Sequence, residues 1–338
     1  MRIILDGMGG DNAPAEIVKG AVAAAESISD EIYIVGEPGA IEKQLKACKY
    51  KGDQIKIVPA HDVITMHDSP VKAIRHKTDS SLVVGLNMLK NGEGDMFVSA
   101  GNTGALIVGS RLLLGRIRGI DRPALASVYP DMTGGDPCLL VDAGASSESK
   151  ARNLLEYGLM GSIFVEKVWG RPDPKVGLVN LGAEESKGTS VTKDAYQMLA
   201  GSHLNFIGNV EGRDVPKGAC DVIVCDGFTG NVILKLTEGV SMSIFKLIKD
   251  VLKSNVKAML GGALIKSKLT GLKDEFDYEE YGGAPVLGVS GPVIKMHGSS
   301  TERAVKSAIL RGIPYAKENV VDIIKQEMLD IAEIIEEE

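Results

Sequence analysis

Short runs rich in Val, Ile and Leu alternate along the chain with longer segments in which apolar residues recur every three or four positions. Short apolar runs bounded by turn residues predict buried strands, and the longer period predicts helices. Strands are expected at residues 2–5, 31–35, 54–58, 95–99, 125–129, 138–141, 175–180, 204–208, 221–225 and 285–289. The helical segments between them include residues 14–27, 80–90, 105–114, 150–169, 192–200 and 301–311.

This alternation predicts an α/β fold of three layers, αβα, in which a mainly parallel sheet carries helices on both faces. No repeat of fixed period is visible, and no Pro- or Ser-rich linker divides the chain. We therefore expect residues 1–338 to form a single large α/β domain.

One segment, residues 231–274, departs from the alternation. Apolar residues keep helical spacing from Ile244 to Leu260, Gly261 and Gly262 interrupt the pattern, and a second amphipathic stretch follows at 263–272. The pattern predicts a protruding helical hairpin that breaks at the two glycines. From Ser241 to Lys273 the segment carries seven lysines and one acidic residue. Two interpretations stay open: a core-packing helix with solvated lysines, or an element that meets an acidic protein or an anionic membrane surface.

Composition narrows the functional classes. Aromatic residues make up 4% of the chain and its net charge is −7, so nucleic acid is not an expected partner. The four cysteines show no metal-finger spacing and are too few for a disulfide framework. The apolar run near the N-terminus is too short for a signal peptide, and no run of about 18 apolar residues could span a bilayer. We expect a cytoplasmic protein.

Candidate chemistry gathers at strand ends. Four predicted strands run into Gly-rich loops, which are residues 6–7, 100–104, 142–144 and 226–231. In a parallel sheet these ends would meet at one edge and border a shared crevice. Glycines allow close approach of backbone N–H groups, Thr and Asn add neutral donors, and helix N-termini favour anions, so a phosphate-sized ligand is expected. Purely structural strand-to-helix turns are the alternative.

Two further loops contain candidate ligands. In residues 180–188 a strand ends in a loop where Lys187 could reach an anion at the sheet edge. In residues 290–300, His297 could donate to a substrate, act as a base or be structural, and Ser299 or Ser300 could cap the next helix. Near the N-terminus, Asp11 or Asn12 together with Pro14 is expected to cap and begin the first helix.

Several familiar site patterns are missing from the sequence. It contains no GxxxxGK[ST] loop, no complete GxGxxG after a strand and no GxSxG elbow. No cysteine lies in a context that favours a thiolate nucleophile, and the five histidines lack metal-ligand spacing. We therefore expect neither a metal site nor a bound cofactor.

Taken together, these motifs and their order resemble the PlsX-type phosphate acyltransferases, the acyl-[acyl carrier protein]:phosphate transacylases of bacterial phospholipid synthesis. The motifs are DGMGGDNAP (6–14), KTDSSLVVGLNMLKNGEGDMFVSAGNTGAL (77–106), IRGIDRPAL (117–125), DAGA (142–145), GAEESKG (182–188), DGFTGNVILK (226–235) and HGSS (297–300). The resemblance covers the chain from Arg2 to about Ala316. It departs from the family at Ser146, where the pattern usually has Asn.

The resemblance implies transfer of a fatty acyl group from the thioester of acyl carrier protein to inorganic phosphate. It also implies a fold like those of isocitrate and isopropylmalate dehydrogenases and phosphotransacetylases, a homodimer, and peripheral association with the inner face of the cell membrane. The acyl-phosphate product would pass to a membrane-bound glycerol-3-phosphate acyltransferase. The alternatives are transfer from acyl-coenzyme A, as in phosphotransacetylase, and a non-catalytic, phosphate-binding protein at the membrane surface.

Under this interpretation the candidate residues receive roles. Lys187 and Asn231 are the predicted catalytic residues, because a lysine and a neutral amide can hold phosphate and stabilise an oxyanion. The predicted phosphate- and substrate-binding residues are Ser99, Gly101, Asn102, Thr103, Gly104, Asp226, Gly227, Thr229, Gly230 and His297. The predicted membrane contacts are Leu264, Ile265, Leu269 and Leu272, and carrier protein is expected on Arg116, Arg118 and Arg122.

Overall fold

The computed structural model describes residues 1–275 and 281–337, with side chains described except at 270, 272–275 and 331–337. The strands are β1 (Arg2–Asp6), β2 (Glu31–Gly36), β3 (Ile55–Pro59), β4 (Met96–Ser99), β5 (Ala124–Tyr129), β6 (Cys138–Val141), β7 (Val176–Asn180), β8 (Phe206–Glu211), β9 (Val222–Val224), β10 (Ala284–Leu287) and β11 (Val293–Lys295). The helices are α1 (Ala15–Ala25), α2 (Pro38–Ala47), α3 (Pro70–His76), α4 (Ser81–Lys90), α5 (Thr103–Gly109), α6 (Ala151–Trp169), α7 (Ser190–Ala200), α8 (Gly227–Leu252), α9 (Val256–Glu275), α10 (Glu302–Lys317) and α11 (Val320–Glu337), with a π-turn η1 (Ser110–Leu114) and a 3-10 turn η2 (Val215–Lys217).

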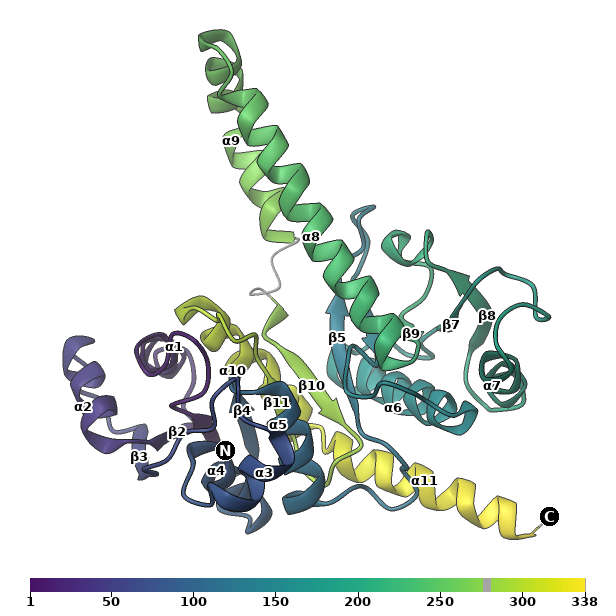
Figure 1. The fold of residues 1–338 in the computed structure, drawn as a ribbon, viewed down its shortest axis with the longest axis horizontal. Helices are drawn as coiled ribbons and strands as arrows, with labels where there is room; N and C mark the ends of the chain where they lie inside the picture. Colours follow the sequence, from purple (N-terminus) through teal and green to yellow (C-terminus); the bar gives the residue numbers. More distant parts are fainter. Residues whose placement is uncertain (276–280, 338) are drawn as a thin grey trace.

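Each of the ten predicted strands corresponds to an observed strand, and the predicted αβα architecture is confirmed (Figure 1). The prediction missed β11, a three-residue strand that follows Gly291 and Pro292. Such a short run next to turn residues carries too little periodicity to stand out.

In the described part of the chain one sheet of eleven strands has the order β3-β2-β1-β4-β11-β10-β5-β6-β9-β7-β8. Most neighbouring strands are parallel, but β10 is antiparallel to both β11 and β5, and β5 is antiparallel to β6. The half that contains β6 to β9 therefore runs opposite to the half that contains β1 to β4.

This reversal corrects one prediction from the sequence. The loops after β1 and β4 leave the sheet at the edge formed by one set of strand ends, whereas the loops after β6 and β9 leave it at the opposite edge. The four Gly-rich loops therefore do not meet at one edge. Hydrophobic periodicity is the same for strands of either direction, so it could not show the reversal.

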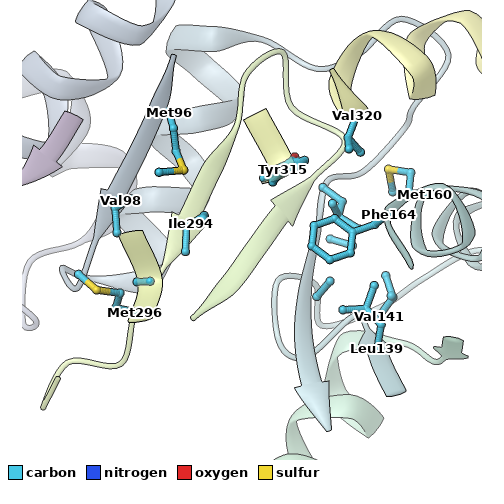
Figure 2. Close-up of a cluster of buried hydrophobic side chains, with 14 of the residues drawn as sticks. Met96, Val98, Leu139, Val141, Met160, Phe164, Ile294, Met296, Tyr315 and Val320 are labelled. Atoms are coloured by element: carbon cyan, nitrogen blue, oxygen red, sulfur yellow. The ribbon is translucent and has the colours of Figure 1, made fainter. Parts of the chain in front are cut away.

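Alternating side chains on each strand divide the core into layers. Ile3 and Leu5 of β1 pack with the helices α1 and α10, whereas Ile4 packs on the other face with α4. In the second half, Leu139 packs on the α6 face and Leu140 on the α8 face. Figure 2 shows the first of these layers, in which side chains from the two halves form one buried cluster across the middle of the sheet.

The predicted helical hairpin is present and extends from the body as α8 and α9 (Figure 1). Its turn lies at residues 253–255, and Gly261 and Gly262 lie inside α9, so the predicted break was misplaced. The Asn255 side chain accepts a hydrogen bond from the Ala258 N–H at 2.9 Å and begins α9. That cap was a stronger signal than the glycines, which a helix tolerates. Among the described helices, none is long and apolar enough to cross a bilayer.

The predicted helix caps near the N-terminus and after β11 are wrong. Helix α1 follows Pro14 without a side-chain cap, and the Asn12 amide instead donates to the Ser299 carbonyl at 3.1 Å. Helix α10 follows Thr301, while the Ser300 hydroxyl donates to the His297 carbonyl at 2.7 Å. These polar side chains connect two loops to each other, which local sequence rules cannot foresee.

The contact between α1 and α10 gives a test of the packing. A Cβ on Gly20 would lie 2.4 Å from the Val305 Cβ, so Gly20→Ala should lower the free energy of unfolding by about 1–3 kcal/mol. Gly239 lies within α8 with no atom within 4 Å of its added Cβ, so Gly239→Ala should raise that free energy by up to about 1 kcal/mol. Urea denaturation of both variants measures the difference, and shifts of the same sign would contradict this packing.

Candidate functional site

A cavity of about 530 Å³ lies between the two halves of the sheet. One wall comes from the loops that follow β1, β4 and β11, and contains Asp11, Thr103 and His297. The facing wall comes from α8 and the loop after β6, and contains Asn231 and Gly144. The loops that leave opposite edges thus still border one cavity, because α8 returns across the sheet after it leaves β9.

The start of α8 fixes this return path. A Cβ on Gly227 would lie 2.2 Å from the Ser146 carbonyl oxygen, and a Cβ on Gly230 would lie 1.9 Å from the Asp142 carbonyl oxygen. Any side chain at either position would push the helix away from the loop after β6. Farther along α8, the Thr237 and Tyr129 hydroxyls are hydrogen-bonded at 2.8 Å, which holds the helix over β5.

The predicted ligands in this loop therefore divide into two groups. Asp226 caps α8 by accepting from the Thr229 N–H at 2.9 Å and the Thr229 hydroxyl at 2.7 Å. The start of α8 is shaped by Asp226, Gly227, Thr229 and Gly230, and none of these four lines the cavity. The fifth predicted residue of this loop, Asn231, does line it. Its side chain lies next to Gly144.

The loop after β4 divides in the same way. Ser99 is fully buried, and its hydroxyl donates to Asp6 at 2.6 Å and accepts from the Gly101 N–H at 3.0 Å. The side-chain oxygen of Asn102 accepts from the Ala105 N–H at 3.0 Å, and its side-chain amide N–H groups donate to backbone carbonyls in residues 65–68. Thr103 is the residue of this loop that reaches the cavity.

Two glycines of the same loop serve close packing. A Cβ on Gly101 would lie 3.1 Å from the Ser99 hydroxyl oxygen, and one on Gly104 would lie 2.8 Å from Pro70. The loop is thus shaped chiefly by contacts inside the protein.

Lys187 lies outside the cavity. It is exposed in the loop between β7 and α7, where its N–H donates to the Glu184 carbonyl at 3.1 Å. Because β7 is parallel to β9 and next to it, this loop leaves the same edge as the start of α8. Its catalytic role stays a prediction.

His297 lines the cavity as predicted. Its Nδ1 lies 2.8 Å from the Ser299 hydroxyl oxygen and accepts from the Ser299 N–H at 3.3 Å. In the tautomer in which Nδ1 accepts both hydrogen bonds, the proton of the neutral ring is on Nε2. Partial burial of the ring lowers the pKa of His297, and the positive charge of Lys235 on α8 lowers it further. The neutral ring can therefore donate one hydrogen bond from Nε2 at neutral pH.

Lys295, which sequence reasoning missed as a site residue, ends β11 at the floor of the cavity. It is 7% exposed, and its ammonium group donates to the Met296 carbonyl. Among the described residues, no carboxylate oxygen lies within 4.0 Å of that ammonium. Desolvation lowers the pKa of Lys295 to about 8, with Lys235 acting in the same direction and Asp6 and Asp11 opposing it.

Burying a cation without a paired acid destabilises the folded protein unless a bound anion neutralises the charge. The cavity therefore offers one buried cation, Lys295, and neutral donors on Asn231, His297 and Thr103. On the outer side, Lys235 forms an ion pair with Glu238 at 2.8 Å. The described residues contain no cluster of three His, Cys, Asp or Glu side chains that could hold a metal. The arrangement suits a phosphate-sized anion next to a polarised carbonyl.

Comparison with known proteins gives consistent matches. The family model described as "Fatty acid synthesis protein" matches residues 1–323. A phosphate acyltransferase from Alkaliphilus oremlandii is 50% identical over 96% of this chain and 97% of its own length. One from Clostridium tetani is 47% identical over 98% of this chain and 99% of its own length.

Solved structures show the same fold at low identity. A phosphotransacetylase from Streptococcus pyogenes has a TM-score of 0.65 and 17% identity, covering 94% of each chain. A branched-chain phosphotransacylase from Enterococcus faecalis has a TM-score of 0.59 and 12% identity, covering 94% of this chain and 99% of its own. A 4-hydroxythreonine-4-phosphate dehydrogenase from Klebsiella pneumoniae has a TM-score of 0.54, 12% identity and the same coverage. The expected likeness to phosphotransacetylases and to a dehydrogenase fold is confirmed.

The position of Lys295 predicts how anion binding depends on pH. Its ammonium is charged below a pKa of about 8 and loses that charge as the pH rises. The affinity for inorganic phosphate should therefore be steady up to about pH 8 and fall by up to roughly tenfold per pH unit above it. Isothermal titration calorimetry from about pH 7.5 to about pH 9.5 measures this. In Lys295→Arg the cation stays charged, so the slope should disappear; an equal slope in both proteins would contradict the assignment.

Proposed function

Because the chain belongs to the fatty acid synthesis protein family, we propose that it transfers a fatty acyl group from the thioester of acyl carrier protein to inorganic phosphate. The products are acyl-phosphate and free carrier protein. Relatives that match almost end to end are phosphate acyltransferases, which supports an acyltransferase with phosphate as the acceptor.

The observation that carries this proposal is the buried ammonium of Lys295, which forms no ion pair with a described residue and lines the same cavity as the Asn231 amide. Lys295 would hold the phosphate, while Asn231 and the His297 Nε2–H would donate to the carbonyl oxygen of the thioester. A phosphate oxygen attacks the carbonyl carbon, a C–O bond forms, the C–S bond breaks, and the thiolate leaves and takes up a proton. Phosphate is already a nucleophile, so the site must only align it and stabilise the oxyanion.

Basic surfaces support carrier protein as the acyl donor. Arg116 and Arg118 are exposed between η1 and β5, although Arg116 is paired with Asp121 at 3.3 Å. Arg122 is half-buried and donates to the Glu148 carbonyl, so it contributes less to this surface. Positive surfaces accelerate the approach of acidic proteins such as acyl carrier protein. The acyl-phosphate would then serve phospholipid synthesis through a membrane-bound glycerol-3-phosphate acyltransferase.

The hairpin supports a peripheral contact with the inner face of the cell membrane. On α9, Leu264 is 85% exposed, Ile265 is 44% exposed and Leu269 is half-buried, while the side chain of Leu272 lies outside those described. Exposed lysines flank these residues on the same helix. Leucines beside lysines suit shallow insertion into anionic lipid.

The long helix α8 supports a homodimer. Large apolar side chains are exposed along it every three or four residues, at Phe228, Val232, Leu236, Val240, Ile244, Leu247 and Val251. A contiguous apolar stripe on a helix usually meets another protein surface. A second copy of α8 would cover it with matching side chains.

The acyl donor is tested by assaying acyl-phosphate, trapped with hydroxylamine, from palmitoyl-carrier protein and from palmitoyl-coenzyme A. We expect turnover with phosphate and carrier protein whether or not magnesium is present. A preference for coenzyme A would favour the phosphotransacetylase-like alternative. A protein that binds phosphate but forms no product from either donor would be a non-catalytic binding protein.

The same assay distinguishes the two candidate cations. Asn231→Ala and Lys295→Met should each lower turnover by roughly 10²–10³, the usual effect of losing one such donor. Lys187→Ala should lower turnover similarly if its loop supplies a catalytic cation. Lys193→Ala on α7, another exposed lysine close to this loop, is the matched control. Loss in Lys187→Ala with full activity in Lys295→Met would assign phosphate binding to Lys187.

The membrane contact is tested with one exposed leucine. Leu264→Glu places a charge on the proposed lipid face and should abolish sedimentation with anionic liposomes. Leu181→Glu is the matched control, since Leu181 is 83% exposed in the loop after β7. Thermal unfolding confirms that both variants are folded. Unchanged liposome binding by Leu264→Glu would mean that this part of α9 does not meet lipid.

A further inference from the structure

A second hollow, of about 410 Å³, lies beside the cavity described above. It is bordered by the end of α6, the middle of α10 and the segment that leads into β10. Val128, Tyr281 and Gly283 line both spaces. The two hollows therefore meet at the segment that leads into β10.

Most of the side chains that line the second hollow are apolar. Its lining includes Phe164, Val168 and Trp169 of α6 and Leu310 of α10. Figure 2 shows Phe164 as part of the buried cluster that joins the two halves of the sheet.

The charged groups of this hollow lie at its border. Arg171 forms an ion pair with Asp221 at 3.2 Å, and its guanidinium lies 5.0 Å from the centroid of the Trp169 ring. Arg311 is exposed to solvent. The hollow therefore combines a mostly apolar set of side chains with two arginines in its lining.

The junction with the first cavity lies directly beside Lys295. Ala284 of β10 is paired with Lys295 of β11, and a Cβ on Gly283 would lie 2.7 Å from the Lys295 carbonyl oxygen. Gly283 also has a φ of +97°, a conformation that favours glycine. The first cavity and the second hollow thus adjoin next to the strand pair that contains Lys295.

We propose that this second hollow binds the hydrocarbon chain of the acyl group whose carbonyl reacts in the first cavity. The proposal rests on the proposed function and adds the location of the chain. Each methylene moved from water into an apolar site strengthens binding by roughly fourfold. Long acyl chains should therefore be preferred over short ones, with the methyl end near Trp169.

The first test uses the native protein and its single tryptophan, Trp169, as a reporter. Stearoyl-carrier protein, made with a carrier that lacks tryptophan, bears a nitroxide label near the methyl end or near the carboxyl end of the chain. Phosphate is left out, so no transfer occurs. We expect stronger quenching of Trp169 by the label near the methyl end. No quenching, or equal quenching by both labels, would overturn the proposal.

The second test fills the hollow. Val168→Trp should lower kcat/KM for a palmitoyl donor by about tenfold or more, because several methylenes lose their site, and leave a butyryl donor unchanged. Ile163→Trp is the matched control, since Ile163 is half-buried on the same helix and does not line the hollow. Equal loss for both donors would assign the hollow to the arm of the carrier protein, and unchanged palmitoyl transfer would also overturn the proposal. If native protein forms no acyl-phosphate from any donor, the proposed function fails instead.

Discussion

The cavity depends on the close contact between the first turn of α8 and the loop after β6. Gly227 and Gly230 bring the helix backbone against the carbonyl groups of Ser146 and Asp142, where no side chain would fit. From this contact α8 turns back over β5, so that Asn231 faces residues from the other half of the sheet. Without it, the reversed strand direction would leave the two sets of loops at opposite edges.

The return of α8 over β5 also explains why the polar groups of the cavity come from both halves of the sheet. The half with β1, β4 and β11 contributes a buried cation and a neutral imidazole, whereas α8 contributes a neutral amide. In the proposed reaction, phosphate and the thioester carbonyl would need different partners, since one is an anion throughout and the other becomes negative only during reaction. Because Asn231 lies on one half and Lys295 and His297 lie on the other, small relative movements of the halves would change the alignment of these three groups.

The sequence was sufficient for the layers and for every described strand except β11, because the strand runs and helical periods are strong. It was not sufficient for strand direction, because a buried β6 has the same pattern in either orientation. Asn102 shows a second limit, since its amide serves a helix cap and a distant loop. Lys295 shows a third limit. A lysine at the end of a short strand is expected at the surface, but the fold buries this one. The signal that could have revealed it is its place between an apolar strand and the HGSS motif.

Helix α8 also sets a length scale. It runs without interruption from Asn231 in the cavity to Leu252 beside the hairpin turn, which corresponds to about 30 Å of helix. If Leu264 and Ile265 rest on lipid, the reaction takes place at the other end of a rigid spacer that is shorter than α8, because these residues lie part-way back along α9 from the hairpin turn. The cavity would then lie at a fixed distance from the bilayer. That distance would keep the enzyme at the membrane and leave room for a carrier protein between the cavity and the lipid. A fatty product would have to cross that layer of water, so hand-over to the next enzyme becomes a problem of geometry as well as chemistry.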